Sequence, residues 1–169
     1  MQKQIKYFNT YEIKDLKDML LKTVARNSNK VAFKIKTDDG KIVNKTFKEF
    51  KEDVEGLATK LIKMNLKNKR IAVMGKNSYS WAISYLSATI IGVVVPIDKE
   101  STDGNVVDFI NKSRAEALIA DDKYLKRIKL LEKNLTNEIT FLSTEKKSTK
   151  YLNIFSLIDE RKRNDFKWK

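Results

Sequence analysis

One stretch of the sequence, residues 70–98, constrains the fold more than any other. It reads RIAVMGKNSYSWAISYLSATIIGVVVPID. It divides into an apolar run of strand length at Ile71–Met74 and a turn at Gly75–Ser78. These are followed by an apolar segment of helix length at Tyr79–Ile91, which Gly92 ends, and by a second apolar run at Val93–Ile97. Continuous apolar runs are typical of parallel strands covered on both faces. The stretch therefore predicts a strand–helix–strand unit of a parallel sheet.

The same alternation continues towards the C-terminus. The next expected elements are a helix capped by Ser101 or Thr102 and reaching Ile110, a strand at Ala117–Ala120, a helix opened by Asp121 or Asp122, and a strand at Ile139–Leu142. Three or more strand–helix alternations predict an α/β fold, with a mostly parallel sheet flanked by helices.

The segment before this unit has a different pattern. Apolar residues at helical spacing predict a helix over Tyr11–Arg26, behind Thr10 as N-cap. The sequence VAFKIKTDDGKIVNKTF alternates apolar and polar residues around Asp39-Gly40, which predicts a β-hairpin. Thr46 and Glu49 have the spacing of a capping box and predict a helix that ends near Asn65.

Length and composition indicate one folded unit. The 169 residues are 41% hydrophobic, enough for one sizeable core. We assign residues 1–150 to an α/β subdomain. Residues 151–169 are expected to hold a short helical segment at Ile154–Ile158 and a disordered tail that includes Arg161, Lys162 and Arg163.

The composition excludes several kinds of chemistry. The chain has no cysteine and no histidine, which excludes thiolate or histidine zinc sites, cysteine nucleophiles and Ser-His-Asp triads within it. The N-terminus lacks an apolar signal core, and the most apolar window, Trp81–Val95, is shorter than the roughly 20 residues of a membrane span. Together with the missing cysteines, this favours the cytoplasm.

The glycines are too far apart for a phosphate loop. They stand at positions 40, 56, 75, 92 and 104. A dinucleotide fingerprint and a P-loop both need several glycines within one turn, so that backbone N–H groups can approach phosphate oxygens. The chain by itself is therefore not expected to be a nucleotide-dependent enzyme.

The net charge of +13 suggests a polyanionic partner such as nucleic acid. It comes from 29 lysines and only 6 arginines, however, and the lysines are spread over every segment. Arginine is the side chain that binds phosphates and guanine edges through two parallel hydrogen bonds. A general compositional bias towards lysine explains the charge better.

Four groups of residues are candidate sites, and each has a structural alternative that we favour. Gly75–Ser78 with Lys76 could bind an anion or only cap a helix, and Trp81, Tyr85 and Leu86 could line an acyl pocket or only pack in the core. Asp121 and Asp122 could hold magnesium or cap a helix, and Arg161–Arg163 could contact nucleic acid or form a solvated tail.

Three segments resemble the N-terminal part of the adenylate-forming acyl-CoA synthetases, also called AMP-binding or acyl-activating enzymes. The segments are KVAFKIKTDDGKIVNKTFKEF, VEGLATKLIKMNLKNKRIAVMGKNSYSWAISYLSATIIGVVVPID and VVDFINKSRAEALIAD, within residues 10–142. Asn77, Trp81, Gly92 and Pro96 stand in the family's register, and the long-chain fatty acid branch is the most similar. Ser80 departs from that pattern, which often has an acidic residue there.

The resemblance implies a ligase that uses ATP and magnesium to join a carboxylate to AMP and then passes the acyl group to coenzyme A. Family members hold the triphosphate with a Ser/Thr/Gly-rich loop followed by Pro-Lys, and this motif does not occur in the sequence. We therefore assign no catalytic, cofactor-binding or metal-binding residue to this chain. It is expected to be an inactive fragment whose partners are the remaining lobes of the ligase. The alternative is a small basic binding module for nucleic acid or protein.

Overall fold

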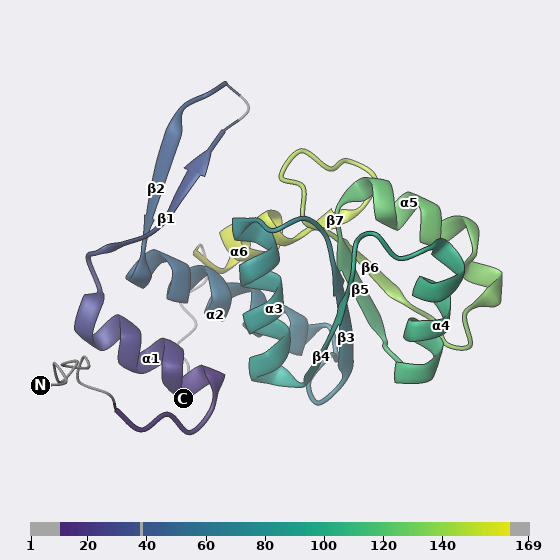
Figure 1. Ribbon diagram of the computed structural model, residues 1–169, viewed down its shortest axis with the longest axis horizontal. Helices are drawn as coiled ribbons and strands as arrows, with labels where there is room; N and C mark the ends of the chain where they lie inside the picture. Colours follow the sequence, from purple (N-terminus) through teal and green to yellow (C-terminus); the bar gives the residue numbers. More distant parts are fainter. Residues whose placement is uncertain (1–10, 38, 163–169) are drawn as a thin grey trace, which may run out of the picture.

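The computed structural model describes residues 11–37 and 39–162, which form three layers around a five-stranded parallel sheet (Figure 1). The strands lie in the order β4-β3-β5-β6-β7. Their bounds are β3 Arg70–Met74, β4 Val93–Ile97, β5 Ala117–Ala120, β6 Thr140–Ser143 and β7 Leu152–Asn153. The predicted mostly parallel α/β fold is confirmed.

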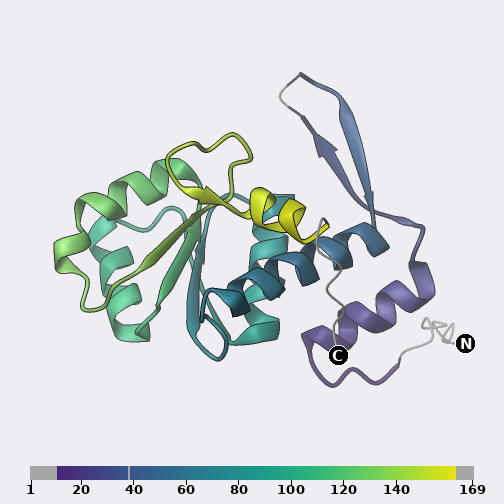
Figure 2. The same ribbon diagram turned by 180° about the vertical axis from the view of Figure 1, so that it is seen from behind.

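Helices cover both faces of the sheet. One face carries α1 Leu16–Asn27, α2 Phe47–Lys63, α3 Tyr79–Ile91 and α6 Ile154–Lys162; the other carries α4 Asp103–Ser113 and α5 Asp122–Leu130, which a 3-10 turn at Glu132–Asn134 follows. Figure 2 shows α6 lying along α2. Because side chains alternate along a strand, Ile71 and Val73 join the first core, and Ala72 and Met74 join the second.

The N-terminus of α2 has the predicted capping box. The Thr46 hydroxyl accepts a hydrogen bond from the backbone N–H of Glu49 at 3.2 Å. In return, the Glu49 carboxylate accepts one from the backbone N–H of Thr46 at 2.8 Å. Both bonds satisfy N–H groups that a helix start leaves without a partner.

Several helix and strand bounds differ from the prediction. α1 begins at Leu16 with Asp15 as its N-cap, and the predicted cap Thr10 lies outside the described residues. β6 begins and ends one residue later than predicted, and α6 extends beyond Ile158. The two-residue strand β7 was not predicted, because two residues are too few to show a period. We keep the boundary at residue 150 as a proposal, although β7 and α6 pack on the same body.

The second strand of the unit at residues 70–98 also differs from the expectation. β3 lies between β4 and β5 and is buried from Ile71 to Met74, but β4 is an edge strand that pairs with β3 alone, and only Ile97 of its five residues is buried. Val93 is 53% exposed. Pro96, which has no backbone N–H to donate, is tolerated at such an edge.

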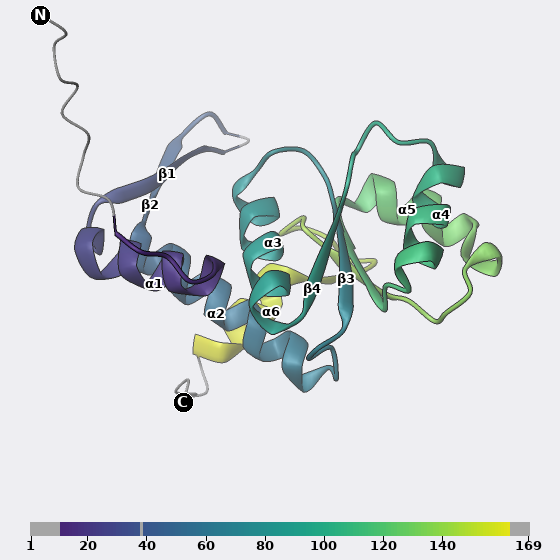
Figure 3. The ribbon, with the colours of Figure 1, turned by 60° about the horizontal axis from the view of Figure 1, so that its bottom comes forward.

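The predicted hairpin is present and stands away from the main body (Figures 1 and 3). It consists of β1 Val31–Lys36 and β2 Ile42–Thr46, which pair only with each other. A two-stranded hairpin is marginally stable alone in water. Its base is anchored by the ring of Phe33, which lies 4.8 Å from that of Phe50 and 5.1 Å from that of Tyr79.

A buried carboxylate completes this anchor. Asp53 on α2 is 5% exposed. It forms an ion pair of 3.0 Å with Lys45 of the hairpin and accepts a hydrogen bond of 2.8 Å from the Tyr79 hydroxyl on α3. One side chain therefore connects the hairpin and two helices. Burial, and then the hydrogen bond and charge of Asp53, raise the pKa of Tyr79 well above its usual range.

The raised pKa predicts how stability depends on alkaline pH. An unfolded tyrosine loses its proton near pH 10, whereas the folded Tyr79 keeps it, so its contribution is full below about pH 10 and is lost as the pH rises further. Between pH 9 and 11 we expect the native chain to lose more free energy of unfolding than the Tyr79→Phe variant. Urea unfolding of both proteins at each pH measures the difference. Equal losses would contradict the assignment.

Gly92 lies where α3 turns into β4, against the backbone of Lys69. A Cβ atom at this position would lie 2.3 Å from the Lys69 carbonyl oxygen. The same oxygen accepts a hydrogen bond of 3.0 Å from the N–H of Val93. The glycine therefore allows the close approach that starts the pairing of β3 with β4.

Candidate functional site

The strand order places one crevice at the carboxyl ends of the sheet. From β3 the chain passes through α3 on one face to β4, whereas from β5 it passes through α5 on the other face to β6. Adjacent strands whose connections leave in opposite directions form a crevice between their carboxyl ends, and open α/β sheets bind ligands there. In this chain the crevice lies between Gly75, after β3, and Asp121, after β5.

Asp121 fills this crevice. The residue is 7% exposed, and its Oδ1 would lie 3.3 Å from a Cβ atom placed on Gly75. The same oxygen accepts a hydrogen bond from the hydroxyl of Thr144, which follows β6. The absence of a side chain at Gly75 therefore makes room for a carboxylate of the protein itself.

The capping interpretation of the aspartate pair is wrong for Asp121. The residue occupies the N-cap position of α5, but its side chain makes no capping bond. It binds Thr144 instead, while the Asp122 carboxylate accepts a hydrogen bond from the Ser143 hydroxyl. The backbone N–H of Asp122 donates to the Glu145 carboxylate at 3.0 Å. The pair therefore fastens the end of β6 to the start of α5.

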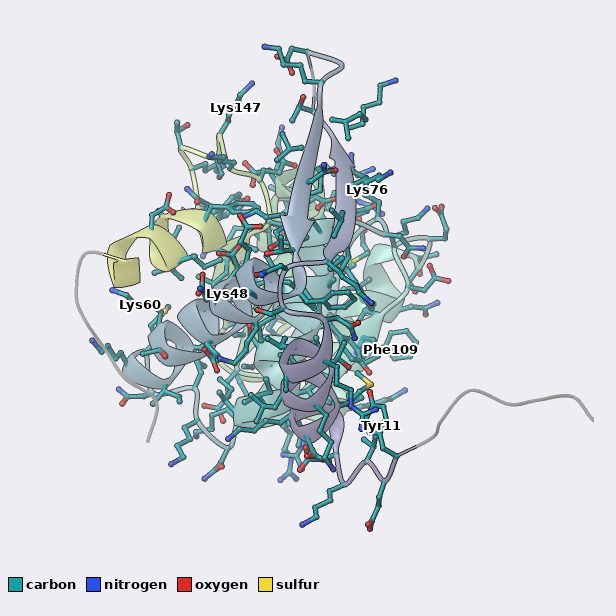
Figure 4. All side chains as sticks on the ribbon, turned by 90° about the vertical axis from the view of Figure 1, so that its left-hand side faces the viewer. Tyr11, Lys48, Lys60, Lys76, Phe109 and Lys147 are labelled. Carbon is teal, nitrogen blue, oxygen red and sulfur yellow. The ribbon has the colours of Figure 1, made fainter. Side chains whose placement is uncertain are left out.

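A groove opens above this crevice. It has a cavity volume of about 650 Å³, and three segments line it: Thr37 and Asp39 of the hairpin; Lys76, Ser78 and Ser80 of the β3–α3 turn; and Asp121 with residues 144–147. Lys76 and Lys147 lie beside the hairpin in Figure 4. The lining holds three lysines and three acidic residues, so it carries no strong net charge. Among residues 11–37 and 39–162, no three or more Asp or Glu side chains gather as a metal site would require.

Asp39 at the hairpin tip is neutralised locally. Lys41 contacts its carboxylate at 2.8 Å, and Thr37 donates a hydrogen bond of 2.5 Å to it. The bond from Lys41, followed by the bond from Thr37, lowers the pKa of Asp39 below its usual range. The two hairpin residues that line the groove, Thr37 and Asp39, therefore add little net charge to it.

The turn Gly75–Ser78 serves as a helix cap, as we favoured. The Ser78 hydroxyl accepts a hydrogen bond of 3.1 Å from the backbone N–H of Trp81. This bond occupies one of the donors that an anion would otherwise use. Lys76 is exposed and forms no hydrogen bond or ion pair with any residue that the structure describes.

The aromatic residues Trp81 and Tyr85 of α3 pack against each other, and Trp81 also packs against the core. The rings of Trp81 and Tyr85 stack at 5.1 Å with an angle of 21° between their planes. Trp81 and Leu86 are half-buried and pack against the core between α2, α3 and the sheet. The side chains of Arg161, Lys162 and Arg163 lie outside the described part of the chain.

A comparison of the sequence with known families now decides the assignment. Residues 20–163 match the AMP-binding enzyme family, which covers more than half of the chain. The chain belongs to the AMP-binding enzyme family. The resemblance seen in the sequence is therefore confirmed.

Several solved structures share the fold at low sequence identity. An anthranilate CoA ligase in complex with anthranoyl-AMP is 19% identical with a TM-score of 0.72, over 85% of this chain and 26% of that one. A luciferase-like enzyme from the mealworm Zophobas morio is 16% identical with a TM-score of 0.74, over 90% and 36%. A protein from Rhodopseudomonas palustris, assigned as a long-chain-fatty-acid CoA ligase, is 17% identical with a TM-score of 0.71, over 84% and 35%.

The chain thus spans about a quarter to a third of the length of these structures. No curated protein matches its sequence. Within the described residues, no helix is both long and apolar enough to cross a membrane.

The sequence did not reveal the contact between Asp121 and Thr144. Both residues follow strands, so their nearness depends on β5 and β6 being neighbours in the sheet. A hydroxyl after a strand is common and signals nothing by itself. Only the strand order identifies the pair.

Proposed function

We propose that this chain is the N-terminal lobe of an ATP-dependent acid–CoA ligase, which activates a fatty acid as acyl-AMP and transfers the acyl group to coenzyme A. The observation that carries the proposal is the family match over residues 20–163. The fatty-acid class is supported by the likeness to the long-chain branch in the stretch around Asn77, Trp81 and Pro96.

In this proposal the chain is scaffold and not a catalytic unit. The reaction brings together an anionic carboxylate and an anionic triphosphate, so its site must supply backbone donors, a cation and a metal. The sequence has no Ser/Thr/Gly-rich loop followed by Pro-Lys, and Asp121 fills the crevice between the carboxyl ends of β3 and β5. ATP, magnesium and coenzyme A would therefore bind mainly through the other lobes. We assign no catalytic residue here, and we place the ligase in the cytoplasm.

Surface features support a role in packing against other lobes. The hairpin carries exposed apolar side chains outside the main core: Val31 is 45%, Ile42 58% and Val43 43% exposed. α3 is apolar around most of its circumference, yet Trp81 and Tyr85 are only half-buried. We take this apolar surface to be where the other lobes pack.

The test compares this chain with the product of the whole reading frame that encodes it. We expect the whole product to catalyse ATP–pyrophosphate exchange that depends on a carboxylate, fastest with a long-chain fatty acid and slower with benzoate or anthranilate. We expect residues 1–169 alone to catalyse none. Radiolabelled pyrophosphate incorporated into ATP measures both.

Each other outcome would change the proposal in a defined way. Exchange by residues 1–169 alone would contradict the scaffold role. Faster exchange with an aromatic acid would overturn the fatty-acid class. A whole product that activates no acid would overturn the ligase itself and favour a basic binding module, whose affinity for nucleic acid would fall steeply with salt.

A further inference from the structure

A second cavity lies at the opposite edge of the sheet, where the strands begin. It has a volume of about 710 Å³, within the range of small-molecule sites. Nine residues line it: Met64, Asn65, Leu66, Arg70, Arg114, Glu116, Asn137, Glu138 and Thr140. Arg70 begins β3, Thr140 begins β6, and Glu116 directly precedes β5, at the lower edge of the sheet in Figure 1.

Two arginines of this cavity are free to bind a ligand. Arg70 and Arg114 form no ion pair or side-chain hydrogen bond with any residue that the structure describes. Arginine is scarce in this chain, which has 29 lysines and 6 arginines. Because the composition favours lysine so strongly, two arginines at one cavity suggest that the shape of the guanidinium group, as well as its charge, matters for binding. The planar guanidinium binds a phosphoryl or carboxylate group through two parallel hydrogen bonds, which lysine cannot do.

Arg114 is held in an unusual backbone conformation. It follows α4 with φ 53° and ψ 42°, in the left-handed region. Glycine and asparagine adopt this conformation readily, but a long side chain there costs about 1 kcal/mol. The two other described non-glycine residues with positive φ are asparagines, Asn65 and Asn68. An arginine in such a position indicates that its side chain has a role besides ending helix α4.

The acidic residues of the cavity leave it with a positive charge. Glu116 is paired with Lys69, whose Nζ lies 2.9 Å from its carboxylate. Glu138 is the second acid in the lining, and it opposes two arginines. Counted with Lys69, the groups at the cavity carry three positive and two negative charges, so an added anion is attracted.

We propose that this cavity binds the phosphoryl group of a small molecule, with Arg70 and Arg114 as its two ligands. Asn65, Asn137 and Thr140 supply neutral hydrogen-bonding groups for the rest of the ligand. The site goes beyond the proposed ligase function and does not depend on it. It lies at the amino ends of the strands, away from the crevice at Asp121, and it needs no other lobe.

Isothermal titration calorimetry of residues 1–169 with inorganic phosphate and with ADP tests the proposal. We expect saturable binding of one molecule, and Arg70→Gln or Arg114→Asn to weaken it at least about tenfold. Arg70→Lys, which keeps the charge but loses the paired donors, should also weaken it. Tighter binding of ADP than of phosphate would identify a nucleotide, and equal binding would identify the phosphoryl group alone.

Lys76→Gln is the matched control, because it removes one positive charge at the opposite edge of the sheet. An equal loss in this variant would show attraction to the net charge of +13 and overturn the site. Absence of saturable binding, or unchanged binding in both arginine variants, would overturn it as well. Thermal unfolding confirms that each variant folds. Arg114→Asn should unfold at the same or a higher temperature, since asparagine suits the left-handed conformation.

Discussion

Replacing Gly92 by alanine is expected to lower the free energy of unfolding by about 3 kcal/mol or more. The new Cβ atom would lie 2.3 Å from the carbonyl oxygen of Lys69 and 3.0 Å from its nitrogen. Both are backbone atoms, so no side-chain rotation can relieve the overlap, and β3 and β4 would have to separate where their pairing begins. Urea unfolding followed by circular dichroism measures the loss.

Gly104→Ala is the matched control for this prediction. Gly104 lies in the first turn of α4, and a Cβ atom there would meet nothing within 4 Å. Alanine in a helix is favoured over glycine by up to about 1 kcal/mol, so this variant should be more stable than the native chain. If the two alanine variants unfold at the same urea concentration, the close approach at Gly92 does not contribute to the free energy of unfolding.

Replacing Asp53 by alanine is expected to have an effect of similar size, a loss of about 3 kcal/mol. The variant leaves Lys45, whose side chain is 23% exposed, and the buried hydroxyl of Tyr79 without their shared partner. Tyr79→Phe removes only the hydroxyl and should cost about 1 kcal/mol. Because Asp53 joins the hairpin to α2 and α3, its loss should also increase amide hydrogen exchange in β1 and β2.

Asp108→Ala provides the reference for removing an aspartate from the surface. Its side chain is 63% exposed and lies 4.0 Å from Lys112. An exposed ion pair contributes little, so a change within about 0.5 kcal/mol is expected. A loss at Asp53 no greater than the loss at Asp108 would contradict the anchoring role. Faster hydrogen exchange spread over the whole chain, and not centred on the hairpin, would indicate general destabilisation.

Local sequence patterns predicted most of the fold because the relevant signals lie close together in the chain. Thr46 and Glu49 are three residues apart, Gly92 separates α3 from β4, and the bounds of β5 follow from abrupt changes between apolar and polar residues. The position of β4 at the edge could not be predicted in this way. The strand order decides which strands lie beside β4, and its five apolar residues would give the same sequence pattern at the edge of the sheet as in the middle.

The candidate sites show the same limit. The sequence correctly indicated that Gly75–Ser78 caps a helix, since the cap residue and its partner Trp81 are neighbours. It gave the wrong reason for Asp121, because the partner Thr144 is 23 residues away and belongs to another strand. The cavity at Arg70 and Arg114 left no sequence signal either, since its residues come from four separate segments.

The packing of α6 on α2 affects how this chain can fold during synthesis. Ile154, Leu157 and Ile158 are buried in one core with Val54 and Leu57, about a hundred residues earlier. Every buried residue of the core under α4 and α5 has been synthesised once β6 is complete, and only the partly buried Tyr151 follows, whereas the core under α2 and α3 must wait for α6. A nascent chain that stops before Ile154 therefore presents an uncovered apolar surface, which is a target for chaperones.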